Sequence, residues 1–326
     1  MKKVILILPY FGKLPDMFPL FFETVKKNSK IQFLLITDSK EKILESAQNV
    51  TLIQEELAGF KSRMEYRLKQ KVTLKKPYKL CDYKPLYGYV FEDEIKAFDY
   101  WGYCDCDLIF GDLYQFIEPL MEEGYDKIFA SGHLTLFRNT EENNALFRAG
   151  KEAETLFEKV CGSEQIFWFD EDYKGKENIH DIFLKSGKRV FSEDLSLNFN
   201  IDTNVFQRKQ YDPQKRTYID IPYRKEQYYW ENGHIYQISK LDGKLVEKEY
   251  PYMHFQARYM HGWDKVLSKT CFKIVPNRFF VCKKIPRTLE DWKKERKWYF
   301  GGQRLIQLKR RILNKLKKVR RKWVSR

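Results

Sequence analysis

Two aspartates, Asp105 and Asp107, have the type and spacing of a metal-binding motif. They lie in residues 100–112 (YWGYCDCDLIFGD), an apolar run interrupted by the two acids. Side chains two residues apart in an extended chain project to the same side, so both carboxylates can reach one cation. At the end of a buried strand the two acids would repel each other and lose solvation, unless a hard divalent ion neutralises them. The alternative is a surface turn with two solvated acids, but the apolar flanks disfavour an exposed loop.

The surrounding sequence resembles a known family. A buried strand that ends in D-x-D, about a hundred residues into an α/β chain, is similar to the nucleotide-sugar glycosyltransferases of the GT-A fold. More closely, residues 79–88 (KLCDYKPLYG) followed by residues 101–112 resemble an uncharacterised family of bacterial GT-A-like proteins associated with capsular and exopolysaccharide biosynthesis. The resemblance covers residues 1–260 and implies a Rossmann-like, mixed α/β sheet that binds a nucleotide sugar.

Hydrophobic patterning predicts an α/β fold from the first residues onward. Residues 4–8 and 31–36 are continuous apolar runs, typical of parallel strands covered on both faces. Between them we predict a helix capped by Asp16. Further along, residues 241–244 (LDGK) predict a hairpin turn inside a Tyr-rich region, which we interpret as a smaller β-rich acceptor lobe.

The domain prediction follows from these patterns. We predict a GT-A-like domain over residues 1–285, with a nucleotide-sugar-binding half at 1–138 and an acceptor half at 139–285. A basic amphipathic tail at 286–326 follows it.

The predicted donor site combines strand ends with the 79–88 motif. Ligands of open α/β sheets collect at the carboxyl ends of strands, so the loop after the first strand and the acid after the second are candidates. Cations and an acid at a helix entry suit a diphosphate and a sugar hydroxyl. Alternatively, Asp38 caps a helix and the motif is a capped surface helix. The predicted donor-binding residues are Pro9, Tyr10, Phe11, Asp38, Lys79, Asp82, Lys84 and Arg258.

The resemblance also implies a third metal ligand. GT-A enzymes commonly place a late histidine on the cation of the D-x-D, which here is His254, and Arg258 could hold the departing diphosphate. The alternative for His254 is a structural core histidine. The predicted metal ligands are therefore Asp105, Asp107 and His254, with Mn²⁺ or Mg²⁺ as cofactor.

A long loop at residues 162–178 carries aromatic and acidic residues, a combination that suits sugar binding. The sequence leaves inverting and retaining chemistry open. An inverting transferase needs a carboxylate base near the acceptor, whereas a retaining one need not use a carboxylate in that way. The candidates for that base are Asp170, Glu171 and Asp181, and His133 is a further candidate for the acceptor side.

Positive charge is concentrated at the carboxyl end. The net charge is +15, and residues 304–326 hold eleven Lys or Arg and no acid, which leaves +4 for the rest. Apolar residues recur there at helical spacing, which predicts a basic helix in the interface of an anionic membrane. A coiled-coil or docking helix is the alternative, and no nucleic-acid-binding module is present to favour RNA or DNA. The stripe consists of Leu305, Leu308, Ile312, Leu316, Val319 and Trp323.

Several classes of protein are disfavoured. Six cysteines without C-x-x-C spacing suggest neither a zinc site nor a disulfide scaffold, and fit free thiols in a reducing cytoplasm. Pro9 ends the first apolar run too early for a signal peptide, and no run reaches the roughly 18 residues that span a bilayer. No G-x-G-x-x-G marks a dinucleotide site. We expect a cytoplasmic protein, peripheral at the inner face of the membrane.

The sequence thus predicts a metal-dependent glycosyltransferase. Its donor would be a nucleotide diphosphate sugar, and its acceptor a lipid-linked or polysaccharide chain in cell-surface polysaccharide biosynthesis. Two alternatives use the same residues: a nucleotidyl- or phosphotransferase acting on sugars, and a non-catalytic polysaccharide-assembly or carbohydrate-binding protein with a degenerate GT-A fold.

Overall fold

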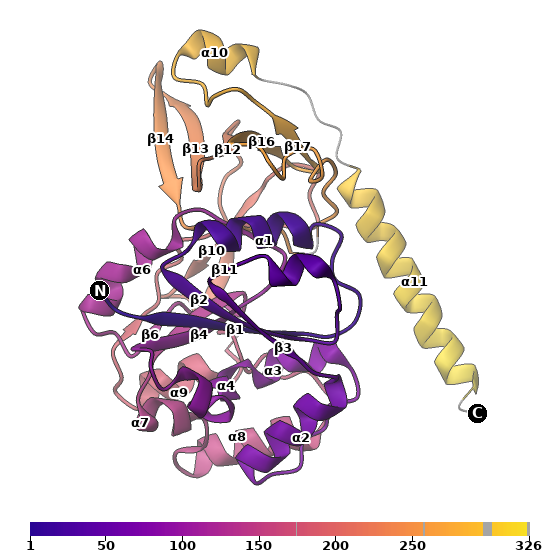
Figure 1. Cartoon of the computed structure of the whole chain (residues 1–326). Helices are drawn as coiled ribbons and strands as arrows, with labels where there is room; N and C mark the ends of the chain where they lie inside the picture. Colours follow the sequence, from indigo (N-terminus) through magenta and orange to yellow (C-terminus); the bar gives the residue numbers. More distant parts are fainter. Residues whose placement is uncertain (174, 257, 296–301, 325–326) are drawn as a thin grey trace.

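A seven-stranded mixed sheet forms the centre of the larger part of the molecule (Figure 1). The computed structural model describes residues 1–173, 175–256, 258–295 and 302–324, with side chains of the last helix described as far as residue 313. β1 is parallel to β2 and β4, whereas β7 runs antiparallel to β4 and β6. The fold is therefore mixed α/β. In spatial order the strands are β3 (Val50–Gln54), β2 (Ile31–Thr37), β1 (Val4–Tyr10), β4 (Tyr100–Cys104), β7 (Leu134–Arg138), β6 (Lys127–Ile128) and β8 (Val190–Phe191).

Side chains of the central strand alternate between two cores. Val4, Leu6 and Leu8 pack with α1 (Phe18–Lys27) and α6 (Leu113–Glu122) on one face of the sheet. Ile5 and Ile7 pack on the other face, with α2 (Leu57–Leu68), α8 (Lys151–Gly162) and α9 (Ile179–Lys185). Each large apolar side chain buried here stabilises the fold by about 1.5–3 kcal/mol. Both faces are covered, which explains why these strands read as continuous apolar runs.

One predicted helix start was wrong. The N-cap of α1 is Met17, not Asp16, and no side chain caps the helix. A proline within the first two positions supplies the turn instead, since its fixed φ suits a helix start and its missing N–H has no partner there anyway.

The 79–88 motif folds as a series of short helical turns. They are η2 (Pro77–Lys79), α3 (Leu80–Tyr83), η3 (Lys84–Leu86) and α4 (Tyr87–Val90), followed by α5 (Glu92–Ile95). Gly88 packs so closely on Trp101 that a Cβ atom there would lie 2.2 Å from the indole. The Trp101 indole N–H in turn donates to Asn144 Oδ1 at 2.7 Å. The glycine therefore locks the motif against β4, the strand that leads into the D-x-D.

The chain changes sheet immediately after the D-x-D. β5 (Leu108–Phe110) leaves the main sheet and pairs antiparallel with β15 (Tyr252–His254), which places His254 opposite Leu108. Long-range pairing thus brings the late histidine beside the two aspartates. The spatial order of this second sheet is β11 (Thr217–Asp220), β10 (Arg208–Asp212), β9 (Leu197–Phe199), β15 and β5.

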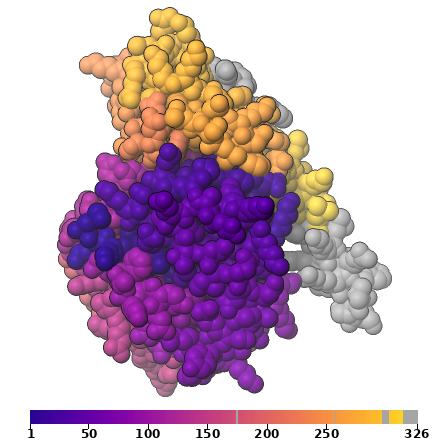
Figure 2. Space-filling model, in the orientation of Figure 1, coloured from indigo at the N-terminus to yellow at the C-terminus, as the bar shows by residue number. Residues whose placement is uncertain are grey.

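A third, antiparallel sheet forms a smaller lobe on top of the body (Figures 1 and 2). The hairpin predicted at residues 241–244 is confirmed, because Asp242 and Gly243 join two of its strands with φ values of 48° and 80°. α10 (Leu289–Lys294) buries Trp292 against this lobe. This part of residues 286–326 therefore packs on the smaller lobe. The strands are β14 (Lys244–Tyr250), β13 (His234–Leu241), β12 (Gln227–Glu231), β16 (Cys271–Val275) and β17 (Arg278–Val281).

The last helix, α11 (Gln303–Val324), extends along one side of the body (Figure 1). Two contacts attach the first part of the helix to the rest of the protein. The Arg304 backbone N–H donates to Asn204 Oδ1, and Arg311 forms an ion pair with Asp202 at 2.7 Å. Leu305, Leu308 and Ile312 are exposed. Leu316, Val319 and Trp323 lie outside the described side chains. Among the described residues, no helix is both long and apolar enough to cross a membrane.

Candidate functional site

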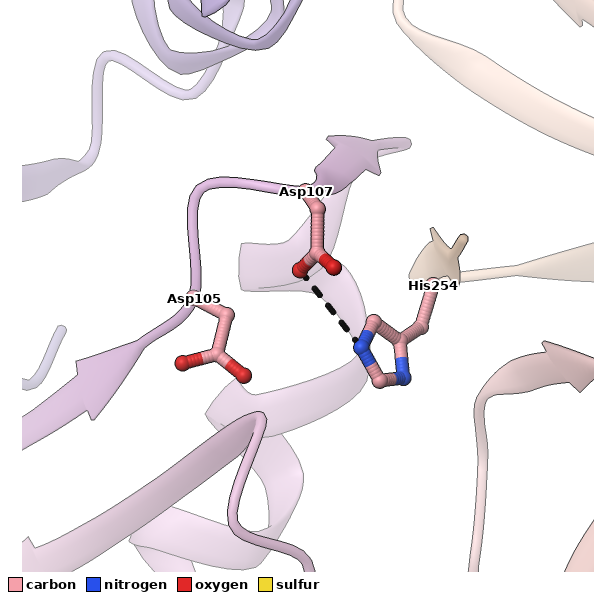
Figure 3. Close-up of side chains that lie close together, drawn as sticks. All are labelled: Asp105, Asp107 and His254. Carbon is pink, nitrogen blue, oxygen red and sulfur yellow. Dashed lines mark ion pairs between the residues drawn. The ribbon is translucent and has the colours of Figure 1, made fainter. Parts of the chain in front are cut away.

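Asp105, Asp107 and His254 converge at the carboxyl end of β4 (Figure 3). One ligand atom from each residue lies within 4.8 Å of the others, and His254 Nε2 is 3.5 Å from Asp107 Oδ1. Two carboxylates and one imidazole are donors that suit Mn²⁺ and accept Mg²⁺. This triad could therefore hold a divalent metal ion.

The imidazole of His254 is held from behind. Its Nδ1 lies 3.2 Å from Asn198 Oδ1, an atom that also accepts from Gln256 at 2.7 Å. An amide oxygen can only accept, so Nδ1 carries the proton of that bond and Nε2 faces the carboxylates. The ring of His133 stacks on that of His254 with centroids 4.3 Å apart. Burial acts to lower the pKa of His254, but the carboxylates of Asp107, Asp105 and Glu171 together outweigh it and raise the pKa above its ordinary value.

Lys84 joins the metal triad to the loop that carries Asp170. Its ammonium group lies 2.7 Å from Asp105 Oδ1, 2.7 Å from the Gly132 carbonyl and 3.3 Å from Asp170 Oδ2. Burial acts to lower its pKa, but Asp105 and Asp170 together raise it well above the ordinary value, so the group stays charged. The arrangement leaves the second oxygen of Asp105 available to a metal ion.

Asp170 and Glu171 form the acidic side of the site. Burial raises the pKa of Asp170 to about 7, against the opposing effect of Lys84, and it also raises the pKa of Glu171. Gly132 makes the close approach possible, because a Cβ atom there would lie 2.7 Å from Asp170 Oδ2. A carboxylate with a raised pKa is suited to accept a proton near neutral pH.

Two cavities meet at this point. The smaller cavity, of about 420 Å³, contains the D-x-D, the end of β1 and Arg258. The larger cavity, of about 740 Å³, contains Asp170, Glu171, His254 and the loop after residue 165. Both cavities are lined by Pro9, Tyr10, Tyr78, Leu80, Lys84 and Asp105.

The predicted residues at the first two strand ends differ in their positions. Pro9 and Tyr10 line both cavities, and Phe11 lines the larger one. Asp38 lines neither, and its carboxylate accepts the Gly12 N–H at 2.8 Å. Gly12 has φ +92°, so Asp38 fixes the turn that carries Tyr10 and Phe11.

Lys79 and Asp82 form a buried ion pair behind the site. Their charged atoms are 2.8 Å apart, and the side chains are 2% and 0% exposed. The Asp82 carboxylate also accepts the backbone N–H groups of Phe167 and Phe169, and Lys79 donates to the Gln165 carbonyl. Neither side chain lines a cavity. The structure therefore gives this pair a positioning role for the loop, in place of the predicted donor contact.

Arg258 lies in the wall of the smaller cavity. It is buried, and its guanidinium donates to the carbonyls of Asn200, Thr203 and Pro276. Burial lowers its pKa to about 10. Arg258 therefore ties three segments together beside the predicted diphosphate position.

Asp181 is the one candidate base that lies away from both cavities. It pairs with Lys185 at 2.9 Å and with Arg216 at 2.9 Å, and these cations lower its pKa although burial acts to raise it. Asp181 therefore belongs to a structural ion network that also includes Asp172.

Sequence reasoning passed over several residues that line the site. Asn198 is a lone amide between apolar residues of β9, and that pattern was the available signal for a positioning role. The remainder gave no local signal. They include Tyr78, Lys209, Tyr218, Gln256 and Tyr259.

The model of one protein family matches residues 6–283. The chain belongs to DUF6625, a family of unknown function. No curated protein matches this DUF6625 chain.

Solved structures of glycosyltransferases show low similarity to this DUF6625 protein. Mouse xyloside xylosyltransferase 1, apo form, is 8% identical with a TM-score of 0.38, over 61% of this chain and 88% of that one. The galactosyltransferase LgtC, in complex with donor and acceptor sugar analogs, is 10% identical with a TM-score of 0.32, over 60% of this chain and 75% of that one. The apo form of the glycosyltransferase GlyE of Streptococcus pneumoniae TIGR4 is 14% identical with a TM-score of 0.34, over 62% of this chain and 47% of that one. These similarities are too low to support a functional argument. The argument rests on the site itself.

Proposed function

We propose that this DUF6625 protein is a metal-dependent glycosyltransferase of GT-A type. It would transfer a sugar from a nucleotide diphosphate donor to a lipid-linked or polysaccharide acceptor in cell-surface polysaccharide biosynthesis. The observation that carries the proposal is the convergence of Asp105, Asp107 and His254 where two cavities meet. A transferase needs this arrangement, because donor and acceptor must approach one reacting carbon from different sides.

On the donor side, the chain supplies positive charge and an aromatic wall. Asp105, Asp107 and His254 would hold Mn²⁺ or Mg²⁺, which when bound neutralises the departing diphosphate. Arg258 adds a buried cation in the wall of the same cavity. Tyr10, at the end of β1, provides a ring for the base or ribose.

On the acceptor side, the chain supplies carboxylates. Glu171 is more exposed than Asp170, which Lys84 holds at 3.3 Å. We assign Glu171 as the group that accepts the proton of the acceptor hydroxyl, and Asp170 as the group that orients Lys84. This assignment corresponds to inverting chemistry, in which a base activates the acceptor for direct displacement.

A panel of nucleotide sugars tests the proposal directly. Each sugar is incubated with the full chain and Mn²⁺, and binding and slow hydrolysis are followed. We expect one donor to bind in a metal-dependent manner and to release a free nucleoside diphosphate. Release of a nucleoside monophosphate or pyrophosphate would instead identify a nucleotidyl- or phosphotransferase. Binding of sugars without any donor turnover would favour the non-catalytic carbohydrate-binding alternative. Tyr66→Ala, a change at a 70% exposed residue outside both cavities, is the matched control.

We propose further that α11 holds the enzyme on the inner face of the membrane. Its exposed apolar residues and the eleven Lys or Arg of residues 304–326 suit an anionic lipid surface, where each basic residue contributes about 1 kcal/mol. Leu305→Asn with Ile312→Asn removes apolar surface and keeps every charge. We expect this variant, and a chain ending at Gly302, to sediment poorly with anionic vesicles while donor hydrolysis continues. Equal sedimentation of wild type and both variants would show that α11 is not the anchor, and binding that ignores lipid charge and salt would indicate a docking helix.

A further inference from the structure

The larger cavity has an aromatic wall. Tyr78, Trp168, Tyr173 and Tyr218 all line it, and Tyr78 is 74% exposed at the boundary with the smaller cavity. Sugar rings present C–H groups on one face and hydroxyls at the rim, so they pack on aromatic rings and bind polar groups beside them. Binding sites for small polar ligands show this combination of an apolar wall with a few placed polar groups.

Trp168 is held in an unusual backbone conformation. Its φ is +57°, in the left-handed region that bulky residues rarely adopt. Such conformations persist only where surrounding structure imposes them, and they concentrate at functional sites. Here the imposing structure is visible, since the Asp82 carboxylate accepts the backbone N–H groups of both neighbours, Phe167 and Phe169.

Lys79 completes this clamp around Trp168. It neutralises Asp82 at 2.8 Å and donates to the Gln165 carbonyl at 2.7 Å, so a fully buried ion pair fixes the chain just before the tryptophan. On the other side, Tyr103 donates to the Asp170 carbonyl at 2.7 Å. A charged pair is costly to bury, and here it fixes the direction of one indole and the carboxylates that follow it.

Charged groups line the larger cavity together with the aromatic residues. Glu171 and Lys209 both line the larger cavity, and the Lys209 ammonium group forms no ion pair with any residue that the structure describes. Hydroxyl groups can donate to a carboxylate and accept from an ammonium group, so this pair fits the rim of a sugar ring.

We propose that the larger cavity binds the acceptor as a pyranose ring, which packs on the wall formed by Tyr78 and Trp168 and places hydroxyls on Glu171 and Lys209. This inference rests on the proposed transferase function and specifies its acceptor as a sugar residue, not a lipid phosphate or a protein side chain. The exposed Lys176 packs on one face of the Trp168 ring, with its ammonium group 3.4 Å from the ring centroid, and does not line the larger cavity.

The test measures binding of simple sugars to the full chain. Methyl pyranosides of glucose, galactose, N-acetylglucosamine and glucuronic acid are titrated by saturation-transfer NMR, with diamagnetic Mg²⁺ and a nucleoside diphosphate present. We expect at least one to bind the wild type. Trp168→Gly should weaken that binding about two- to tenfold, because the ring is lost, while glycine keeps the φ of +57° without strain. Lys209→Met should weaken it about tenfold, and Tyr66→Ala should leave it unchanged.

Two outcomes overturn the inference. One is that no pyranoside binds wild type, and the other is that Trp168→Gly, folded by circular dichroism, binds as tightly as wild type. Calorimetry of nucleoside diphosphate binding in the same samples separates this failure from that of the proposed function. Nucleotide binding without sugar binding overturns the acceptor site alone. Sugar binding without nucleotide binding overturns the transferase proposal and leaves a carbohydrate site.

Discussion

Two lysine–aspartate pairs of the 79–88 region have nearly the same geometry and very different surroundings. In the inner pair, Lys79 and Asp82 are 2.8 Å apart and 2% and 0% exposed. In the outer pair, Lys84 and Asp105 are 2.7 Å apart and 12% and 36% exposed. The inner carboxylate has all its partners within the protein, whereas the outer one lies between a lysine, a candidate metal position and two cavities.

Burial, not residue type, separates the inner pair, which positions a loop, from the outer pair, which belongs to the site. A fully buried ion pair cannot reach a ligand, and its removal exposes the cost of an unpaired buried charge. A pair at a cavity edge costs less to disturb and remains able to exchange partners. We therefore expect changes in the outer pair to affect chemistry, and changes in the inner pair to affect stability first.

The largest expected effect is on the outer pair. Asp105→Asn and Asp107→Asn each remove charge from the metal position without changing volume, and should reduce transfer more than about a thousandfold, since a metal ion contributes several kcal/mol to charge stabilisation. Lys84 keeps Asp170 and the Gly132 carbonyl as partners in Asp105→Asn, so the melting temperature should stay near that of wild type. Full activity of Asp107→Asn, with unchanged metal dependence, would refute the metal site.

The inner pair should respond in stability. Asp82→Ala leaves the Lys79 ammonium group buried and unpaired, and should lower the free energy of unfolding by about 3–5 kcal/mol in urea titrations. The double variant Lys79→Met with Asp82→Leu removes the unpaired charge and should recover part of that loss, because the backbone N–H groups of Phe167 and Phe169 remain without their acceptor. A cost below 1 kcal/mol for Asp82→Ala would show that the clamp is dispensable, and the comparison of the two pairs would fail.

Arg258 lies between these extremes, being both buried and in a cavity wall. Arg258→Ala should weaken nucleoside diphosphate binding by about 1.5–3 kcal/mol in calorimetry, the range of a charge-assisted hydrogen bond. Arg258→Lys keeps the charge but loses the forked contacts to Asn200 and Thr203. Equal nucleotide affinity in wild type and Arg258→Ala would assign the residue to the fold alone.

The smallest effect, taken over a single pH unit, concerns a third buried lysine, Lys127, which contacts no carboxylate of the residues that the structure describes. Lys127 is 0% exposed, donates to the Phe129 carbonyl and lies 3.2 Å from His180 Nδ1, with Asp172 and Asp170 further away. Burial lowers its pKa from 10.5 to about 7. Between these values the unfolded chain binds one more proton than the folded chain, so this lysine makes stability rise with pH by up to about 1.4 kcal/mol per unit.

Lys127→Met should remove that dependence. The free energy of unfolding, measured from pH 7 to 10 for wild type and variant, should converge as the pH rises, with the variant more stable at pH 7. Parallel curves would show that the folded protein keeps Lys127 charged. Tyr66→Ala, a change at an exposed residue, is the control.

Much of the scaffold was readable from local sequence. The apolar run of residues 4–8 predicted a strand buried on both faces, and the LDGK turn predicted its hairpin. The spacing of Asp105 and Asp107 predicted that both carboxylates share one side; they do converge, but in the bend between β4 and β5 and not within a strand. These features depend on residues within a few positions of one another, where the period of two in a strand fixes direction.

Only the tertiary structure decided which charged groups face the cavities. Lys79, Lys84, Asp82 and Asp105 look alike in sequence, yet one pair is sealed behind the 165–169 loop and the other lines the site. In sequence, Asp170 and Asp181 are equal candidates for the catalytic base. In the structure, Asp181 lies in α9 and pairs with Arg216 in a separate ion network. The physical reason is that segments distant in the sequence pack around a charge and set its surroundings, and therefore its role. Local periodicity cannot predict which distant segments these are.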